Sequence, residues 1–287
     1  MRVAAAQPAA PAGPERGRVS EAIELIGEAA ARGAQLVLLP VAYPGPMHVS
    51  SDFDCSGQIA AAAAAAGCAV CWGRIERGDD GRYRTVTYIH GGAGEELMRY
   101  QRAHPATGDV GPTLSGVAIA PGQGFGLAEV DGVRVGALVC SELWLPEVAR
   151  VLAVSGAEVI LAPAGGGFHR VARNWRLLAR ARAIENQCFV VLTQRLLGKE
   201  RGSAMIAGPE GTLERLERPG ICVGDLDLER VRWLRGRDDS MREPKPFASL
   251  PGLLRARRPA LYGTLAEPAP GLYDYDDPPP APGRRAP

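Results

Sequence analysis

The feature of this chain that most restricts its fold is the alternation of short, mostly apolar runs with stretches of helical period. Residues 35–39 (QLVLL) form one such run, which Pro40 ends, and residues 133–140 (VRVGALVC) form another. A strand without a polar side is typical of a sheet that is buried on both faces. Helical stretches such as residues 20–32, which a serine opens and a glycine follows, separate the strands. This order predicts an α/β protein.

The same reasoning predicts the other elements of the chain. Strands are expected at residues 3–7, 68–75, 85–90, 158–162, 189–193, 204–207 and 223–227, and helices at residues 59–66, 141–155, 171–186 and 229–235. From residue 263 onward prolines are frequent, which is typical of a segment with little structure of its own. We therefore expect one domain over residues 1–262 and a Pro-rich tail over residues 263–287.

Composition and charge argue against several classes of protein. The 287 residues carry a formal net charge of +1, so no partnership with nucleic acid or an anionic membrane is expected. The sequence has no run of about 18 apolar residues and no long apolar segment near its start, which argues against a membrane span and a secretory signal. The six cysteines are scattered, which favours free thiols and a cytoplasmic location.

Cys68 and Cys71 have the spacing of half a metal-binding motif. No second pair of cysteines or histidines follows at zinc spacing, and the chain has only four histidines. Because the neighbours of the two cysteines are apolar, we interpret them as part of a strand. We expect neither a metal nor a cofactor.

Four segments carry more specific information about the family. They are GAQLVLLPVAYPG at residues 33–45, LMRYQRAHP at 97–105, VGALVCSELWLPE at 135–147 and ARAIENQCFVVL at 181–192. In this order they resemble the nitrilase, or carbon–nitrogen hydrolase, superfamily, and the likeness extends over about residues 1–262. The resemblance implies a four-layer α-β-β-α sandwich, a small-molecule substrate and, frequently, a homodimer.

Members of this superfamily hydrolyse nitriles, amides or carbamoyl groups through a cysteine thioester. A glutamate acts as the general base, a lysine stabilises the oxyanion, and a second glutamate often supports them. The resemblance places Cys140 at the nucleophile, where a strand turns into a helix. It places Val41 at the first glutamate, Arg102 at the lysine and, in a looser alignment, Ser115 at the second glutamate. Only the cysteine of the set is retained.

The two main substitutions differ in their chemical consequence. Val41 cannot accept a proton, whereas Arg102 keeps a positive charge and five N–H donors but cannot give up a proton. Arg102 could donate to an oxyanion or favour the thiolate form of Cys140. Lys199 and Lys245 are the only lysines among 33 basic residues, so a general replacement of lysine by arginine explains Arg102 equally well. Neither lysine lies in the segment that should carry the catalytic lysine.

The resemblance also indicates which residues line the substrate pocket. They are Val41, Trp144, Gly165, Gly166, Phe168 and His169. The glycines would widen the pocket wall or let the backbone approach a ligand, unless they simply form a flexible loop. His48 and His169 flank these loops and are candidates for a replacement base. We interpret Glu142 and His104 as structural residues.

Two functions of different classes follow from these residues. In the first, Cys140 and Arg102 belong to a cysteine-dependent enzyme of altered mechanism that acts on a small amide, nitrile or activated acyl substrate. Without a carboxylate to activate water, transfer, cyclisation or addition is favoured over hydrolysis, unless a histidine or loop carboxylate replaces the base. In the second, the protein is an inactive pseudoenzyme that binds a small ligand or a partner protein, and Cys140 is a small buried hydrophobic residue.

Overall fold

The computed structural model describes residues 1–9, 15–47, 53–106, 119–165, 171–194, 202–237 and 248–267. Its strands are β1 (Arg2–Gln7), β2 (Leu36–Leu38), β3 (Ala69–Arg77), β4 (Tyr83–His90), β5 (Glu96–Gln101), β6 (Gly126–Val130), β7 (Val133–Ala137), β8 (Val159–Ala164), β9 (Phe189–Gln194), β10 (Ala204–Ala207), β11 (Thr212–Leu216) and β12 (Gly220–Asp225). Its helices are α1 (Arg18–Ala31), α2 (Ser56–Ala66), α4 (Pro146–Val154), α5 (Ala172–Asn186) and α6 (Leu228–Gly236), with short 3-10 helices η1 (Glu15–Gly17), η2 (Cys140–Trp144), η3 (Pro259–Leu261) and η4 (Gly263–Ala266).

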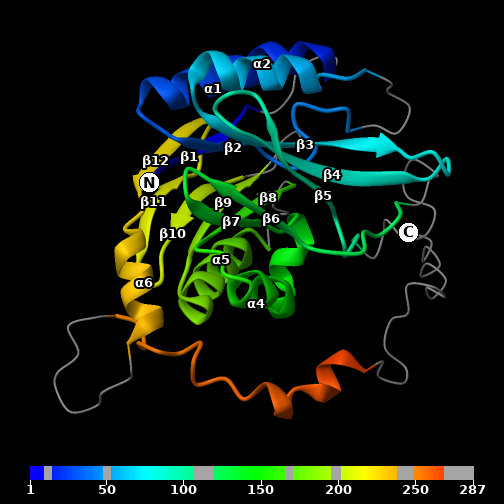
Figure 1. Cartoon of the computed structure of the whole chain (residues 1–287). Helices are drawn as coiled ribbons and strands as arrows, with labels where there is room; N and C mark the ends of the chain where they lie inside the picture. Colours follow the sequence, from blue (N-terminus) through cyan, green and yellow to red (C-terminus); the bar gives the residue numbers. More distant parts are fainter. Residues whose placement is uncertain are drawn as a thin grey trace, which may run out of the picture.

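The strands form two six-stranded sheets that lie face to face (Figure 1). The first sheet has the order β12-β1-β2-β3-β4-β5 and the second β11-β10-β9-β8-β7-β6. In each sheet three central strands run parallel, β1 to β3 in one and β7 to β9 in the other, and the outer strands are antiparallel. The carboxyl ends of parallel strands meet at one edge of a sheet, which is where α/β proteins place their sites.

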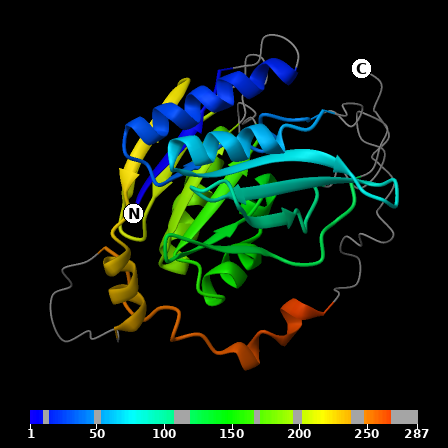
Figure 2. The same cartoon turned by 45° about the horizontal axis from the view of Figure 1, so that its top comes forward.

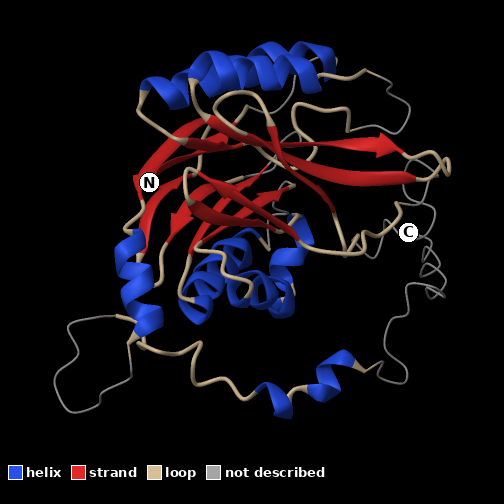
Figure 3. Ribbon diagram, viewed as in Figure 1, coloured by secondary structure: helices blue, strands red, loops and turns tan. Residues whose placement is uncertain are grey.

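Helices cover the outer face of each sheet and complete four layers. Helices α1 and α2 pack on the first sheet and α4 and α5 on the second, so that the helices in Figure 3 flank the paired red strands; Figure 2 shows α1 and α2 lying across their sheet. Between the sheets lies a third apolar cluster that includes the fully buried Leu38, Ile89 and Leu161. The predicted α-β-β-α sandwich is therefore confirmed.

Polar contacts link the two sheets at the carboxyl ends of β1 and β9. The side-chain amide of Gln7 donates to the backbone carbonyl of Gln194, and the hydroxyl of Thr193 donates to the carbonyl of Ala6. Gln7, Thr193 and Gln194 are all buried. These contacts show that the parallel strands of both sheets end on the same side of the molecule.

Two helices differ from the ranges that the sequence predicts. The helix expected at residues 141–155 is interrupted: η2 ends at Trp144 and α4 begins at Pro146. The residue before a proline avoids the helical region, and Leu145 has φ −94° and ψ 105°. Helix α1 begins at Arg18 with Gly17 at its N-cap, rather than at the expected serine.

Cys68 and Cys71, which have the spacing of half a metal-binding motif, face opposite ways. Cys68 contacts the cluster beneath α1 and α2, whereas Cys71 faces the space between the sheets. The two thiols therefore lie on opposite sides of one sheet.

Among the residues that the structure describes, none of the helices is both long and apolar enough to cross a membrane.

Candidate active site

Cys140 lies at a sharp bend three residues after the end of β7. Its φ is +55°, in the left-handed region that residues with a side chain rarely adopt. Strain of this kind is tolerated where the surrounding structure fixes it, and it is common at functional sites. The bend leads into η2, where the backbone N–H of Glu142 donates to the carbonyl of Val139 at 3.1 Å. The side chain of Cys140 is thereby brought to the edge of the inter-sheet core, and the residue is partly exposed.

The ends of β2 and β8 meet next to this cysteine. The backbone N–H of Val41 lies 3.4 Å from the carbonyl oxygen of Ala164, the last residue of β8. A Cβ placed on Gly165 would lie 3.9 Å from the sulfur of Cys140. Val41 and Cys140 both pack against the inter-sheet core. The structure thus brings Val41, Gly165 and Cys140 together, although they come from three different parts of the sequence.

Arg102 reaches the same place from the end of β5. Its backbone N–H donates to the carbonyl of Thr85 at 2.9 Å, and its carbonyl accepts from the N–H of Gly122 at 2.8 Å. The side chain donates through Nη2 to the hydroxyl of Ser141, the residue that follows Cys140. Only 4% of Arg102 is exposed. The guanidinium therefore lies beside the cysteine bend in a largely buried position, where a positive charge acts strongly.

Glu142 is a buried residue that sequence analysis noted but did not place. Its Oε1 accepts from the hydroxyl of Tyr100 at 2.8 Å and from the backbone N–H groups of Ala103 and His104 at 3.1 and 2.9 Å. Nδ1 of His104 lies 3.2 Å from the same oxygen. Oε2 accepts from the N–H of Val139 at 2.6 Å. Burial, followed by the charge of Glu142, raises the pKa of Tyr100 far above its usual range, so the hydroxyl stays a donor.

Trp144 ends η2 and packs against the outer helical layer. Its ring meets that of Trp175 edge-on, with centroids 5.7 Å apart. Arg182 of α5 donates to the carbonyls of Leu143 and Trp144 at 3.1 and 3.3 Å. Arg182 is a supporting residue that sequence analysis missed, because its contacts lie 38 and 39 positions away.

The loop after Val41 is bound closely to β3. The N–H of Gly73 donates to the carbonyl of Tyr43 at 3.2 Å, and that of Ile75 donates to Pro46 at 2.7 Å. A Cβ on Gly73 would lie 2.8 Å from the carbonyl oxygen of Val86 and 3.3 Å from the backbone nitrogen of Ala42. This close approach requires glycine at position 73.

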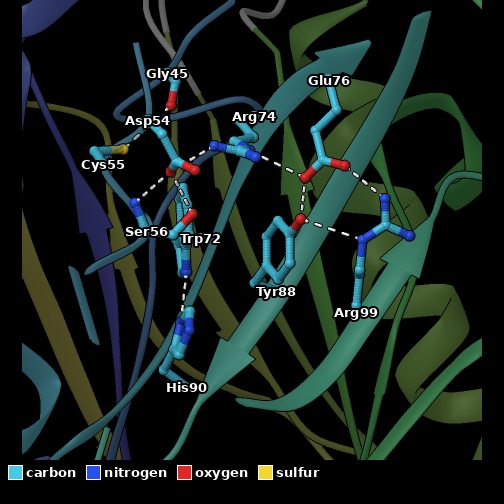
Figure 4. A network of polar contacts seen from close by, with 10 residues as sticks. All are labelled: Gly45, Asp54, Cys55, Ser56, Trp72, Arg74, Glu76, Tyr88, His90 and Arg99. Atoms are coloured by element: carbon cyan, nitrogen blue, oxygen red, sulfur yellow. Dashed lines mark hydrogen bonds and ion pairs between the residues drawn. The ribbon is translucent and has the colours of Figure 1, made fainter. Parts of the chain in front are cut away.

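A network of charged side chains holds the far end of the same loop (Figure 4). Arg74 of β3 forms ion pairs with Asp54, which precedes α2, and with Glu76 at 3.0 Å. Glu76 also accepts from the hydroxyl of Tyr88 and pairs with Arg99 of β5. Both Arg74 and Glu76 are mostly buried. The loop is therefore fixed at both ends.

Several predicted site residues cannot be placed. Gly166, Phe168, His169, His48 and Ser115 lie outside the described residues. Their assignments to the pocket, to a replacement base and to the second glutamate position stay predictions. So does the assignment of Trp144 to the pocket.

Cys140 thus lies in a strained bend at the edge of the core between the two sheets, and the largely buried Arg102 donates to the next residue, Ser141. Residues 2–235 match the model of the carbon-nitrogen hydrolase family. The chain belongs to this family, as the segments quoted from its sequence predict.

Curated relatives agree with this assignment. A protein of Pseudomonas protegens described as "Hydrolase in pqqF 5'region" is 32% identical over 233 residues, which are 78% of this chain and 74% of that protein. The human deaminated glutathione amidase is 29% identical over 272 residues, which are 85% of this chain and 79% of that protein.

A solved structure shares the fold. It is a variant of the amidase from Nesterenkonia sp. AN1 in which leucine replaces a glutamate, and it shows covalent addition of the acetamide moiety of fluoroacetamide at the active-site cysteine. The TM-score is 0.73 and the identity 21%, with 92% of this chain and 97% of that chain covered.

Proposed function

We propose that this protein is a cysteine-dependent enzyme that acts on a small amide, nitrile or activated acyl compound through Cys140, and that it favours transfer of the acyl group over hydrolysis. The observation that carries the proposal is the position of Cys140 in a strained bend, with the Arg102 side chain bound to the adjacent Ser141 and Val41 bound to the end of β8 beside the cysteine. The thiol and a cation are in place, whereas the position of the base holds an apolar side chain.

The first half of such a reaction needs only these groups. A nitrile would add the Cys140 thiolate at its carbon and take a proton from solvent on nitrogen, which gives a thioimidate. With an amide, the Cys140 thiolate attacks the carbonyl carbon and forms a C–S bond, while donors near the bend stabilise the oxyanion. The C–N bond then breaks, and the amine leaves with a proton taken from solvent. The product is a thioester on Cys140.

Val41 affects the second half of the reaction, in which the thioester on Cys140 is broken. Water needs a base to attack the thioester, and a valine cannot take its proton. An amine is a better nucleophile than water, so it can replace the sulfur, form a new C–N bond, release a proton to solvent and return the thiolate. Transfer, or cyclisation when the amine belongs to the substrate itself, is therefore favoured over hydrolysis.

The relatives support this class of substrate. The human relative is an amidase. In the Nesterenkonia amidase variant, the cysteine carries an acetamide group although a glutamate has been replaced by leucine. In that amidase, replacement of the glutamate by an apolar residue is thus compatible with a cysteine that reacts with an electrophile.

Labelling of the intact protein with iodoacetamide at about pH 6 tests the proposal. The other cysteines should be silent, because burial raises the pKa of each of them, to about 11 for Cys55, Cys68 and Cys222, to about 12 for Cys188, and further for Cys71. We expect one fast label that is lost in Cys140→Ser. Labelling of Cys140 no faster than that of glutathione would favour the inactive pseudoenzyme instead.

We further propose that the protein is a homodimer that pairs through α4, α5 and the segment at residues 248–267. Figure 1 shows this segment passing below α4 and α5. Leu177 of α5 and Leu261 and Leu265 of the segment are 65%, 63% and 69% exposed, and Leu265 lies beside Arg150 of α4 and Glu185 of α5. Exposed apolar side chains favour association. Light scattering should give twice the monomer mass, and Leu177→Glu should reduce it; a monomer at all concentrations contradicts the proposal.

We also propose that the protein is located in the cytoplasm. The six cysteines are unpaired, which fits the reducing cytoplasm that the sequence predicts.

A further inference from the structure

The carboxylate of Glu142 connects the two segments that carry Arg102 and Cys140. On one side it binds Tyr100, Ala103 and His104, which surround Arg102 in the sequence. On the other side it binds the N–H of Val139, the residue before Cys140. One fully buried side chain therefore contacts both segments.

The two segments come from different sheets. Residues 100–104 include and follow the end of β5, an edge strand of the first sheet, and Val139 follows β7 of the second. Hydrogen bonds within a sheet cannot fix the distance between two sheets, because they act within the plane of each sheet. A side chain that binds backbone atoms of both can do so.

We propose that Glu142 is a positioning residue that holds the Arg102 guanidinium against the bend of Cys140. The inference rests on the proposed function of Cys140 and Arg102. Glu142 adds no chemistry of its own, because both of its oxygens already accept hydrogen bonds from the protein. Its effect on the thiol passes through Arg102, whose side chain donates to Ser141.

The chemistry of the side chain explains why a carboxylate is needed. The groups around it are a tyrosine hydroxyl, three backbone N–H groups and an imidazole nitrogen. An ionised carboxylate is an acceptor only, whereas glutamine turns an NH₂ group toward one of these donors. Glu142→Gln keeps the size of the side chain but loses hydrogen bonds on one side, so the two segments are no longer held together.

The experiment measures the rate of Cys140 alkylation by iodoacetamide as a function of pH, by mass spectrometry of the intact protein. If Arg102 favours the thiolate, Arg102→Met moves the midpoint of this profile to higher pH. If Glu142 positions Arg102, Glu142→Gln moves it in the same direction and slows labelling at about pH 6.5 roughly tenfold, which corresponds to a midpoint shift of about one pH unit. The double variant should show no further shift beyond that of Arg102→Met, because the two residues act in series.

Glu76→Gln is a matched control. Glu76 is also a largely buried carboxylate that binds a tyrosine hydroxyl and arginines, but its partners lie on β3, β4 and β5 within one sheet (Figure 4). Its loss should lower the free energy of unfolding and leave the labelling profile unchanged. A general loss of stability therefore cannot imitate the expected result.

The outcomes separate the two proposals. A wild-type profile like that of a free thiol refutes the proposed function itself. A shift with Arg102→Met but none with Glu142→Gln, or shifts that add in the double variant, refutes the positioning role alone. If Glu142→Gln does not fold, Tyr100→Phe removes one donor and should give a smaller shift in the same direction; an unchanged profile in that variant also counts against the role.

Discussion

Replacement of Val41 by glutamate should restore a base to the site and convert slow hydrolysis into measurable turnover. The backbone nitrogen of Val41 lies 3.4 Å from the carbonyl oxygen of Ala164. The residue after Ala164 is Gly165, which lies beside the sulfur of Cys140. A carboxylate at this position would therefore reach a water molecule that approaches the thioester. The side chain of Val41 packs against the apolar edge of the core between the sheets.

The expected gain follows from general-base catalysis, which typically contributes about 10²–10⁴-fold in rate. The loop itself should not move, because its main contacts use the backbone of residues 41–46. A half-buried carboxylate costs some stability when it lacks a partner, so the thermal midpoint should fall slightly in the variant.

Release of ammonia from simple primary amides measures the effect. Val41→Gln is the control, since glutamine has nearly the same size as glutamate but cannot act as a base near neutral pH. Addition of Arg102→Lys to Val41→Glu tests whether the lysine is also required. If Val41→Glu releases ammonia no faster than Val41→Gln, although Cys140 is alkylated as in the wild type, the assignment of position 41 to the missing base is wrong.

Three further predictions concern stability and access to the thiol. His90 accepts a hydrogen bond from the Trp72 indole at 2.8 Å, and burial lowers the pKa of His90; the unfolded chain therefore binds a proton first, and the free energy of unfolding, measured in urea, should fall as the pH drops below about 6.5 but less so in His90→Gln. Leu38→Ala, between the sheets, should cost about 2–5 kcal/mol in the same assay, whereas Gln58→Ala, at an exposed position of α2, should change it by less than about 0.5 kcal/mol; equal losses would contradict the burial of Leu38 between the sheets. Gly165→Ala should keep the thermal midpoint but slow alkylation of Cys140, because the added methyl group lies 3.9 Å from the sulfur; an unchanged rate would mean that electrophiles approach from another side.

The strands that sequence patterns predicted are mainly those of the sheet interiors. Strand β9 was expected at residues 189–193 and is observed at Phe189–Gln194, with every side chain buried. Strands β5, β6 and β11 were not predicted, and all three are edge strands. An edge strand is partly exposed and carries polar side chains, as the almost fully exposed β11 shows, so its apolar signal is weak.

Sequence patterns predicted some features of the candidate site and not others. The position of Cys140 at the end of a strand followed from the pattern of residues 133–140, but its positive φ did not, because backbone strain depends on tertiary contacts. The connecting role of Glu142 was not predictable from local sequence. Its partners Tyr100 and His104 lie 42 and 38 positions away, on β5 of the other sheet and just after it.

Backbone carbonyls accept several of the contacts that join the two sheets at the carboxyl ends of their parallel strands. Gln7 and Thr193 both donate to backbone carbonyls, and position 41 is linked to Ala164 through its own N–H group. The identity of the side chain at position 41 therefore contributes little to the frame. The side chain at position 41 can therefore change without loss of the backbone contacts that hold this edge of the two sheets.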